Sequence, residues 1–269
     1  MPVDRRRPTL DAILAVTRTR VAALQPGARD LERAAQRAPQ PRPFPRDPGG
    51  EVGVIAEVKR RSPSQGAIRE DLDPVAHARA YVEGGAVAVS VLTDEPHFGG
   101  SIEDLRRVAA AVSVPVLRKD FVIDEAQILE ARTASASAVL LIARIVSAAQ
   151  LAALASAVRG WDMTPLIEVH ADAELDAAFA AGGSRYVLGV NARDLDTFAV
   201  DLGGAERLIA RVPGSVLVVA ESGVQSRSDV ERLAGAGADF VLVGTSIARR
   251  TDPEAAVRAL VGVERQARP

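Results

Sequence analysis

From Glu51 onward, the chain alternates short runs of β-branched residues with longer stretches rich in Ala, Leu, Arg and Glu. The eight short runs cover residues 52–58, 86–92, 114–118, 138–142, 165–169, 186–190, 216–220 and 239–243. The stretches with helical periodicity cover residues 74–83, 102–112, 124–134, 147–159, 172–181, 203–211, 227–236 and 253–262. A strand followed by a helix, repeated eight times, is the pattern of a closed barrel. We therefore predict an α/β fold, a (βα)8 TIM barrel.

An open, doubly wound parallel sheet is the alternative fold for this alternation. No G-x-G-x-x-G sequence follows the first run, although that pattern is typical of dinucleotide-binding sheets of this kind. The sequences GGA, GGS and GAGAD lie where helices should end, as expected for glycine at helix C-caps. The eightfold repeat favours the closed barrel.

Residues 1–50 differ in character from the rest of the chain. Apolar residues recur at helical spacing between Thr9 and Leu24, which predicts an amphipathic helix there. The sequence PQPRPFPRDP, residues 39–48, predicts a stiff connector that is not helical. We therefore expect an N-terminal helical extension with a proline-rich connector over residues 1–50, and a (βα)8 barrel catalytic domain over residues 51–269.

Composition narrows the classes of function. The chain has 269 residues, 48% of them hydrophobic, and a net charge of −2. It can therefore bury a large core, and its charge indicates neither nucleic acid nor an anionic membrane as a partner. The basic sequence DRRR near the N-terminus is interpreted as a solvated terminus, because no aromatic residues interleave with it.

Membrane insertion, secretion and cysteine chemistry are not expected. No apolar run approaches the roughly 20 residues needed to span a bilayer, and the first residues do not resemble a signal peptide. The absence of cysteine excludes thiol catalysis and thiolate metal sites, and it fits a cytoplasmic protein. The three histidines show no metal-ligand spacing.

Polar residues gather at the predicted carboxyl ends of the strands, where a (βα)8 barrel carries its functional site. Glu57 and Lys59 follow the first apolar run. Because side chains two residues apart on a strand share a face, these two should point the same way. The other polar residues and loop glycines at these ends are Lys119, Glu168, Asn191, Arg193, Glu221, Ser222, Gly244, Thr245 and Ser246.

The two lysines are informative because they are rare. Of 33 basic residues only Lys59 and Lys119 are lysine, and Asn191 is the only asparagine. Codon bias explains the average preference for Arg. An amine can transfer protons near neutral pH when burial lowers its pKa, whereas a guanidinium cannot. We expect acid–base work from both lysines. A structural ion-pair layer that caps the barrel is the alternative, chiefly for Glu57 and Glu221.

Two short glycine-bearing loops follow the last two strands and lead into helices. They are ESGV, which contains Gly223, and VGTSIAR, which contains Gly244, Thr245 and Ser246. Backbone N–H groups in such loops bind anions, so a substrate phosphate is expected here. Ser62, after the first strand, is a candidate for a further hydroxyl contact.

Three of the six phenylalanines lie in predicted loops at the same end of the barrel. Phe98, Phe121 and Phe198 follow the second, third and sixth strands. Together they could form a slot for an aromatic ring. Ordinary packing that anchors the loops is the alternative for each of them.

Seven segments resemble, in order and spacing, those of the indole-3-glycerol phosphate synthase family. They are VIAEVKRRSPSQG, SVLTDEPHFGGS, VPVLRKDFVID, PLIEVH, GVNARDLDTFAVDL, VAESGV and LVGTSI. The resemblance runs from about residue 50 to the end of the chain, and EVKRRSPS is its most specific part. The N-terminal helix and connector also resemble the family's extra segment, which lies over the barrel mouth.

The resemblance implies a carboxy-lyase of tryptophan biosynthesis. Its substrate would be 1-(2-carboxyphenylamino)-1-deoxyribulose 5-phosphate, which closes to an indole ring with loss of CO2 and water. Lys119 then matches the general acid of ring closure, and Glu168 matches the residue that assists later proton removal and dehydration. Lys59 matches a lysine near the substrate carboxylate and sugar hydroxyls, with a share in dehydration, and Glu57 would orient it.

The resemblance implies supporting roles for the remaining residues. Asn191 would orient hydroxyls, Arg193 would help to fix the substrate anions, and Glu221 and Ser222 would complete the site. It implies no metal or organic cofactor, and a small phosphosugar–anthranilate molecule as the substrate partner. Contacts with other enzymes of the tryptophan pathway are a further expectation. How acid and base duties divide between the two lysines stays open.

Two other functions compete with this assignment. Phosphoribosylanthranilate isomerase has similar phosphate loops but commonly uses a Cys and an Asp, and this chain has no Cys. A non-catalytic phosphosugar-binding barrel would lack the charges at the strand ends, which are present here. The departures from the family pattern, such as Gly99-Gly100 and Ala192, lie away from the matched catalytic positions.

Overall fold

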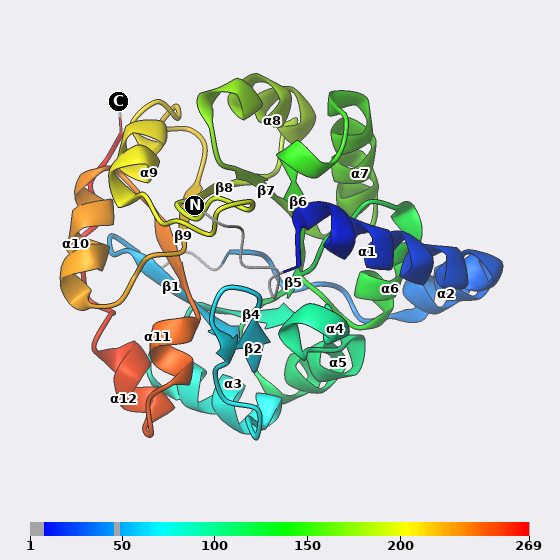
Figure 1. The fold of residues 1–269 in the computed structure, drawn as a ribbon, viewed down its shortest axis with the longest axis horizontal. Helices are drawn as coiled ribbons and strands as arrows, with labels where there is room; N and C mark the ends of the chain where they lie inside the picture. The colour runs from blue at the N-terminus through cyan, green and yellow to red at the C-terminus, as the bar shows by residue number, and fades with distance from the viewer. Residues whose placement is uncertain (1–7, 46–48, 269) are drawn as a thin grey trace.

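The computed structural model describes residues 8–45 and 49–268, and in these ranges eight parallel strands close into a barrel (Figure 1). The barrel strands are β1 (Gly53–Val58), β4 (Ala88–Leu92), β5 (Val116–Lys119), β6 (Ala138–Ile142), β7 (Thr164–Val169), β8 (Val187–Asn191), β9 (Val218–Glu221) and β10 (Phe240–Val243). Strand β1 pairs with both β4 and β10, which closes the sheet on itself. The predicted (βα)8 barrel is confirmed.

Helices alternate with these strands and surround the barrel (Figure 1). They are α3 (Pro74–Glu83), α5 (Ile102–Ala111), α6 (Glu125–Thr133), α7 (Ala148–Gly160), α8 (Leu175–Gly182), α9 (Leu202–Ile209), α10 (Arg227–Gly235) and α12 (Pro253–Arg258). The predicted boundaries differ from these by a few residues, with one larger error. The last helix was predicted to reach residue 262, but Gly262 has a left-handed φ of 75°. Beyond it, Val263 accepts a hydrogen bond from the N–H of Val52 at 2.8 Å.

The apolar core has two layers, which the alternation of side chains along the strands creates. Val54 and Ile167 belong to the layer between the barrel and its helices. Their sequence neighbours Ile55 and Leu166 belong to the second layer, inside the barrel. Neighbouring residues therefore face opposite sides of the barrel wall, as the period of two along a strand requires.

The structure also contains short elements that the sequence did not predict. They are α2 (Ala28–Arg37), α4 (Glu95–Phe98), α11 (Thr245–Ala248), β2 (Arg61–Ser62), β3 (Gly66–Ala67), η1 (Gln25–Gly27), η2 (Ala143–Ile145) and η3 (Asp172–Glu174). Helix α2 has only a narrow apolar stripe, made of Ala28, Leu31, Ala34 and Ala35, and of these only Ala35 is buried. None of the helices in the described ranges combines the length and apolar character needed to cross a membrane.

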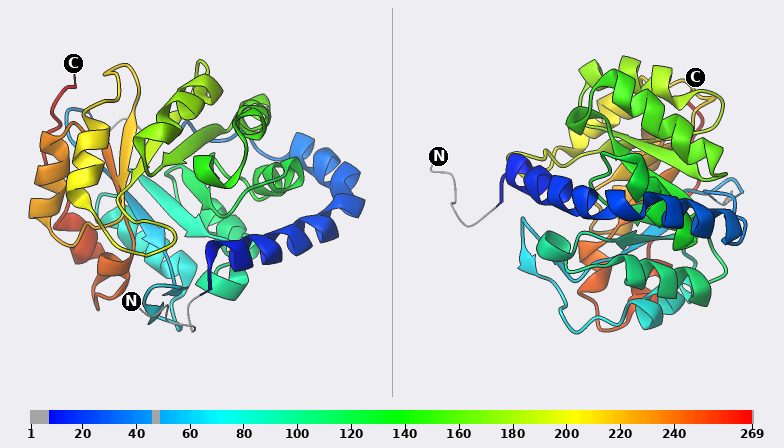
Figure 2. Two further views of the ribbon diagram at one scale, coloured as in Figure 1. Left: turned by 45° about the horizontal axis from the view of Figure 1, so that its top comes forward. Right: turned by 90° about the vertical axis from the view of Figure 1, so that its right-hand side faces the viewer.

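The N-terminal part of the chain lies against one side of the barrel. Helix α1 (Leu10–Leu24) begins after Thr9, whose hydroxyl accepts a hydrogen bond from the N–H of Ala12, and this confirms the predicted start. Figures 1 and 2 show α1 crossing this side, with α2 beside α6. Arg132 of α6 donates hydrogen bonds to the carbonyls of Pro39 and Ala38, at 2.6 and 3.0 Å.

The division of the chain near residue 50 stays a prediction. The sequence DRRR, residues 4–7, and the end of the proline-rich connector, residues 46–48, lie outside the described residues. The earlier part of the connector carries Phe44, which is buried and packs into the layer inside the barrel.

Truncation of an inward-facing leucine tests the two-layer core. Leu166 is fully buried inside the barrel, so Leu166→Ala should lower the free energy of unfolding by about 2–5 kcal/mol. The matched control is Leu217→Ala, because Leu217 is 37% exposed, and its cost should be about 1 kcal/mol or less. Urea denaturation of both variants measures the difference, and equal costs would contradict the burial of Leu166.

Candidate active site

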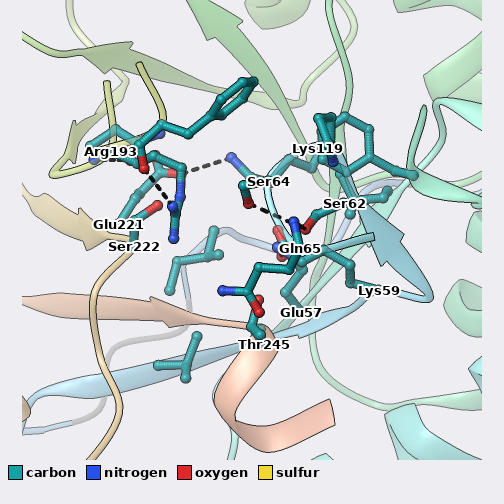
Figure 3. Close-up of a pocket in the computed structure, with 18 of the residues that line it drawn as sticks. Glu57, Lys59, Ser62, Ser64, Gln65, Lys119, Arg193, Glu221, Ser222 and Thr245 are labelled. Atoms are coloured by element: carbon teal, nitrogen blue, oxygen red, sulfur yellow. Dashed lines mark hydrogen bonds and ion pairs between the residues drawn. The ribbon is translucent and has the colours of Figure 1, made fainter. Parts of the chain in front are cut away.

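A cavity of about 540 Å³ opens at the carboxyl ends of the barrel strands. All the residues that the sequence placed in a site line this cavity: Glu57, Lys59, Ser62, Phe98, Lys119, Phe121, Glu168, Asn191, Arg193, Phe198, Glu221, Ser222, Gly223, Gly244, Thr245 and Ser246. Figure 3 shows the labelled polar side chains facing a common space from several strands and loops. The structure therefore brings the predicted set together.

Four charged groups of the cavity continue the inward-facing series of their strands. Each of Glu57, Lys119, Glu168 and Glu221 lies two residues after an apolar side chain of the layer inside the barrel. Their strands β1, β5, β7 and β9 are alternate strands in the closed order of the barrel. Alternate strands of such a barrel contribute side chains to the same layer. The four groups therefore form the polar layer that ends the apolar interior.

Lys119 is the cation at the centre of this layer. Its Nζ donates hydrogen bonds to Oε2 of Glu221 at 2.9 Å and to Oε2 of Glu168 at 3.2 Å. On the far side of Glu168, Nε2 of His170 lies 3.3 Å from Oε1. The carboxylate side chains of Glu168 and Glu221 are each 1% exposed, and the Lys119 side chain is 16% exposed. One ammonium group is thus shared by two buried carboxylates.

Burial and charge distribute the protons of this cluster unevenly. Burial alone would lower the pKa of Lys119, but Glu168, Glu221 and Glu57 outweigh it and raise this pKa. Burial opposes the ionisation of Glu168, yet Lys119 and His170 hold its pKa well below the usual range. Burial raises the pKa of Glu221 to about 8, because the neighbouring Glu168 offsets part of the attraction of Lys119.

Near pH 7 this cluster of Lys119, Glu168, His170 and Glu221 holds protons that it can donate. His170 has its pKa raised to about 9, because Glu168 and Glu174 outweigh the effect of burial. With Lys119 and His170 charged, Glu168 ionised and Glu221 protonated, these four groups carry one net positive charge. The expectation that burial would lower the pKa of the lysine is wrong for Lys119, because its carboxylate neighbours dominate. The cluster holds both a proton donor and a carboxylate base.

Two glycines leave room for the buried carboxyl groups of Glu221 and Glu57. One lies on β8 and the other directly after β10, and these strands alternate with those that carry the charged groups. A methyl group added to Gly189 of β8 would collide with Oε1 of Glu221. A methyl group added to Gly244, directly after β10, would collide with Oε1 of Glu57. Side chains at these positions would therefore displace the buried carboxylates.

Lys59 and Glu57 form a second ion pair on the cavity wall. The Nζ of Lys59 lies 2.7 Å from Oε1 of Glu57, whose side chain is 2% exposed. The two residues point the same way, as their spacing along β1 predicted. Glu57 thus orients the amine of Lys59 toward the cavity.

The loop after β8 presents a guanidinium group to the same cavity. The side-chain oxygen of Asn191 accepts the N–H of Arg193 at 3.0 Å, and Nη1 of Arg193 donates to the carbonyl of Phe198 at 2.9 Å. Phe198 has a left-handed φ of 59°, which turns the loop back toward the barrel. These contacts fix Arg193 at the cavity edge.

The loops after β9 and β10 form the part of the cavity where a phosphate was expected. Ser222 and Gly223 have φ values of 66° and 87°, and the chain turns sharply there. The hydroxyl of Ser246 donates to the carbonyl of Val224 at 2.9 Å, which ties the two loops together. Gly223, Gly244, Thr245 and Ser246 all border the cavity, so a phosphate at this place stays a prediction supported by their proximity.

Apolar side chains also line the cavity. The rings of Phe98 and Phe121 lie with their centroids 6.3 Å apart and are tilted by 41°. Leu10 and Ile13 of α1 border the same cavity. Phe198 also borders the cavity, from the loop after β8.

Several cavity and supporting residues were not found from the sequence. Gln65, in the hairpin between β2 and β3, accepts a hydrogen bond from Nη2 of Arg249 at 2.6 Å, which links two loops across the cavity edge. His170 was noted only as a poor metal ligand, although its position two residues after Glu168 was a signal. Asp120 was missed because a charged residue between Lys119 and Phe121 is expected to point away from the barrel interior.

No group of three or more His, Asp or Glu side chains in residues 8–45 and 49–268 has an arrangement that could hold a metal ion.

Comparisons with known proteins show the family to which the chain is similar. The sequence model of the family described as indole-3-glycerol phosphate synthase matches residues 10–260. The chain is 46% identical over 257 residues to the indole-3-glycerol phosphate synthase of Mycobacterium avium (strain 104), covering 94% of this chain and 93% of that protein. It is 48% identical over 213 residues to that of Azospirillum brasilense, covering 79% and 80%.

Among solved structures, the 3-hexulose-6-phosphate synthase from Salmonella typhimurium has a TM-score of 0.61 and 13% sequence identity with this chain. The similarity covers 78% of this chain and 96% of that chain, and it shows a common fold.

The raised pKa of Glu221 predicts how stability changes with pH. The folded protein keeps a proton on Glu221 that the unfolded chain releases, so the stabilisation is complete below the unfolded pKa of 4.5 and is lost as pH rises through about 8. Glu221→Gln removes this titration. The free energy of unfolding of the variant should therefore rise relative to the native protein by about 1 kcal/mol per pH unit between pH 5 and 8.

Urea denaturation at several pH values measures this difference. His170 loses its own stabilising contribution as pH rises through about 9, but it is present in both proteins. Glu125→Gln, which removes a carboxyl group at an exposed position of α6, is the matched control. A flat difference for Glu221→Gln would contradict the protonated Glu221.

Proposed function

The chain belongs to the indole-3-glycerol phosphate synthase family, and we propose that it converts 1-(2-carboxyphenylamino)-1-deoxyribulose 5-phosphate to indole-3-glycerol phosphate. The reaction forms one carbon–carbon bond and releases CO2 and water, so the protein is a carboxy-lyase of tryptophan biosynthesis. The observation that carries this proposal is the Lys119 ammonium group, buried at the cavity floor between Glu168 and Glu221.

Ring closure needs a proton at the ketone oxygen of the substrate. The aromatic carbon that bears the carboxylate attacks the ketone carbon, driven by the electron pair of the anilino nitrogen. Lys119 donates the proton to the oxygen as the new bond forms. Cleavage of the bond to the carboxylate then releases CO2, and its electron pair restores the aromatic ring.

The carboxylate neighbours of Lys119 raise its pKa and so weaken it as an acid, because each ionised carboxylate stabilises the positive charge. A proton on Glu221 leaves one such carboxylate fewer beside the ammonium group. The pKa of Glu221 is raised to about 8, so near pH 7 this carboxyl is protonated and only Glu168 is ionised. Glu221 is then able to replace the proton that Lys119 has donated, through their 2.9 Å contact.

Dehydration needs an acid for the departing hydroxyl group and a base for the final proton. The nitrogen electron pair expels the hydroxyl, which leaves as water after protonation. Loss of a proton from the carbon next to nitrogen then completes the indole ring. We assign this proton removal to Glu168, which stays ionised, and a share in protonating the hydroxyl to Lys59, which Glu57 orients at 2.7 Å.

The remaining cavity residues hold the substrate. We assign its phosphate to the loops with Gly223, Gly244, Thr245 and Ser246, and its carboxylate to Lys59 and Arg193. Asn191, Ser62 and Ser222 supply polar contacts to the sugar hydroxyls or the phosphate. Phe98, Phe121 and Phe198 are assigned to the aromatic ring, with apolar cover from Leu10 and Ile13.

We assign the N-terminal extension the role of covering the cavity. Leu10 and Ile13 of α1 border the cavity, which supports a role for residues before the barrel in closing it over the substrate. Contact with other enzymes of the tryptophan pathway stays a prediction.

Substitution of each lysine separates the chemical steps. Ring closure precedes CO2 release, and dehydration follows it. Lys119→Met should therefore slow CO2 release and indole formation together by about 10²–10⁴-fold. Lys59→Met should slow indole formation more than CO2 release, because the ring closes but the hydroxyl leaves slowly. Single-turnover reactions with carboxyl-labelled substrate, followed by released label and by indole fluorescence, measure both steps.

Three results would change the assignment. Normal CO2 release by Lys119→Met, with loss in Lys59→Met, would give the acid role to Lys59. A folded native protein that forms no indole product would remove the proposed reaction. Turnover of phosphoribosylanthranilate by the native protein would favour the isomerase instead.

Adding a methyl group beside Glu221 tests the geometry of the cluster. Gly189→Ala displaces the Glu221 carboxylate from Lys119, so kcat/KM should fall by about tenfold or more. Gly235→Ala in α10 is the matched control, because a methyl group there meets nothing within 4 Å and should leave kcat/KM unchanged. Equal kcat/KM values for the two variants would contradict the tight fit around Glu221.

A further inference from the structure

An ion pair fastens the N-terminal helix to the segment that carries Lys119. Arg20, near the end of α1, has its Nη2 2.7 Å from Oδ2 of Asp120, and its Nη1 donates to the carbonyl of Thr93 at 3.2 Å. The Asp120 side chain is fully buried and that of Arg20 is 28% exposed. Helix α1 is therefore attached, through charge, to the residue that directly follows Lys119.

Asp120 collects hydrogen bonds from four different groups. Besides Arg20, its Oδ2 accepts from the hydroxyl of Thr93 at 2.6 Å and from Nη2 of Arg118 at 3.0 Å. Its Oδ1 accepts the N–H of Phe121 at 2.8 Å. Burial alone would raise the pKa of Asp120, but Arg118 and Arg20 hold it below the usual range. The carboxylate is thus ionised and held in one orientation.

The same network holds the two residues on either side of Asp120. The N–H of Thr93 donates to the carbonyl of Lys119 at 3.1 Å, and Nε2 of Gln127 donates to the carbonyl of Phe121 at 3.0 Å. Lys119, Asp120 and Phe121 all border the cavity, and the Asp120 carboxylate between the other two bonds to Arg118, Thr93 and Arg20. A movement of the Asp120 carboxylate would therefore move both neighbours.

Helix α1 also contacts this segment through apolar side chains. Ile13 and Leu14 are buried in the same cluster as Phe121, so apolar burial already favours docking of the helix. Burying the Arg20–Asp120 pair carries a desolvation penalty, and such pairs often contribute little net stability. A buried ion pair can instead hold the neighbouring residues in one arrangement. This matters for catalysis, because a displacement of about 1 Å of a reacting group can lower the rate about 10²-fold.

We propose that Arg20 and Asp120 are positioning residues, whose ion pair fixes Lys119 and Phe121 in their working positions when α1 is docked. The inference rests on the proposed function, because it concerns the residue assigned as the acid. It makes the N-terminal helix part of the catalytic apparatus, although Arg20 acts only through Asp120.

Kinetic measurements give the first test. Arg20→Met removes the cation, and kcat should fall by about 10–100-fold, more than KM rises, since Lys119 acts in the chemical step. Arg20→Lys keeps a charge near Asp120 and should recover a substantial part of kcat. Arg18→Met, at an exposed position of the same helix, is the matched control and should behave as the native protein. All assays are made where denaturation curves show each variant folded.

The two lysines of the chain allow a second test that does not need catalysis. Brief acetylation with acetic anhydride, followed by mass spectrometry of peptides, gives the reactivity of Lys119 relative to Lys59. When Lys119 loses its fixed position between Glu168 and Glu221, its amine becomes more accessible. The ratio should rise several-fold in Arg20→Met and stay at the native value in Arg18→Met.

The two tests separate the inference from the proposed function. If Arg20→Met matches Arg18→Met in kcat, KM and lysine ratio, and only its unfolding midpoint falls, the pair is structural and the inference is wrong. If the native protein makes no indole product, the proposed function fails, while the lysine ratio still decides whether Arg20 positions Lys119. A change of both kcat and the ratio in Arg20→Met, recovered in Arg20→Lys, supports the inference.

Discussion

The rest of this barrel depends on one partly buried ammonium group that lies between two buried carboxyl groups. Lys119, Glu168 and Glu221 come from strands β5, β7 and β9, which are not neighbours in the sheet. Their side chains meet because the sheet closes, and alternate strands then contribute to one layer of the interior. In an open sheet these three strand ends would lie in a row along one edge, with another strand between each pair. The two carboxyl groups could then not both reach the lysine.

The proton that this layer holds is what makes it chemically useful. Full ionisation would balance the charges, because Lys59 and His170 add two cations to Lys119 against three carboxylates. Glu221 is nevertheless buried beside a second carboxylate, Glu168, and burial keeps a proton on it by raising its pKa to about 8. A proton is therefore stored beside Lys119, where the proposed ring closure consumes one.

The sequence predicted the barrel because a strand followed by a helix recurs eight times, and it predicted most polar residues of the cavity because they follow the strands. Lys119 and Glu168 stood out as charged residues at the carboxyl ends of apolar runs, and rarity marked the lysines. The proton balance could not be predicted, because it depends on distances between strands far apart in the sequence. Neither could the partnership of Arg20 with Asp120, which lie 100 residues apart in the sequence. Helix α2 was missed because its apolar stripe is narrow and consists mainly of alanine.

The period of two along a strand explains why the N-terminal helix can act on Lys119 in particular. Every inward residue on a strand has outward neighbours, and those beside Glu168 are the apolar Ile167 and Val169. The outward neighbours of Lys119 are Arg118 and Asp120, both charged and both buried. A charged outward pair can bind a cation from a docked helix with directional hydrogen bonds, whereas an apolar pair offers only contact area. Strand β5 therefore links the chemistry inside the barrel to α1 outside it.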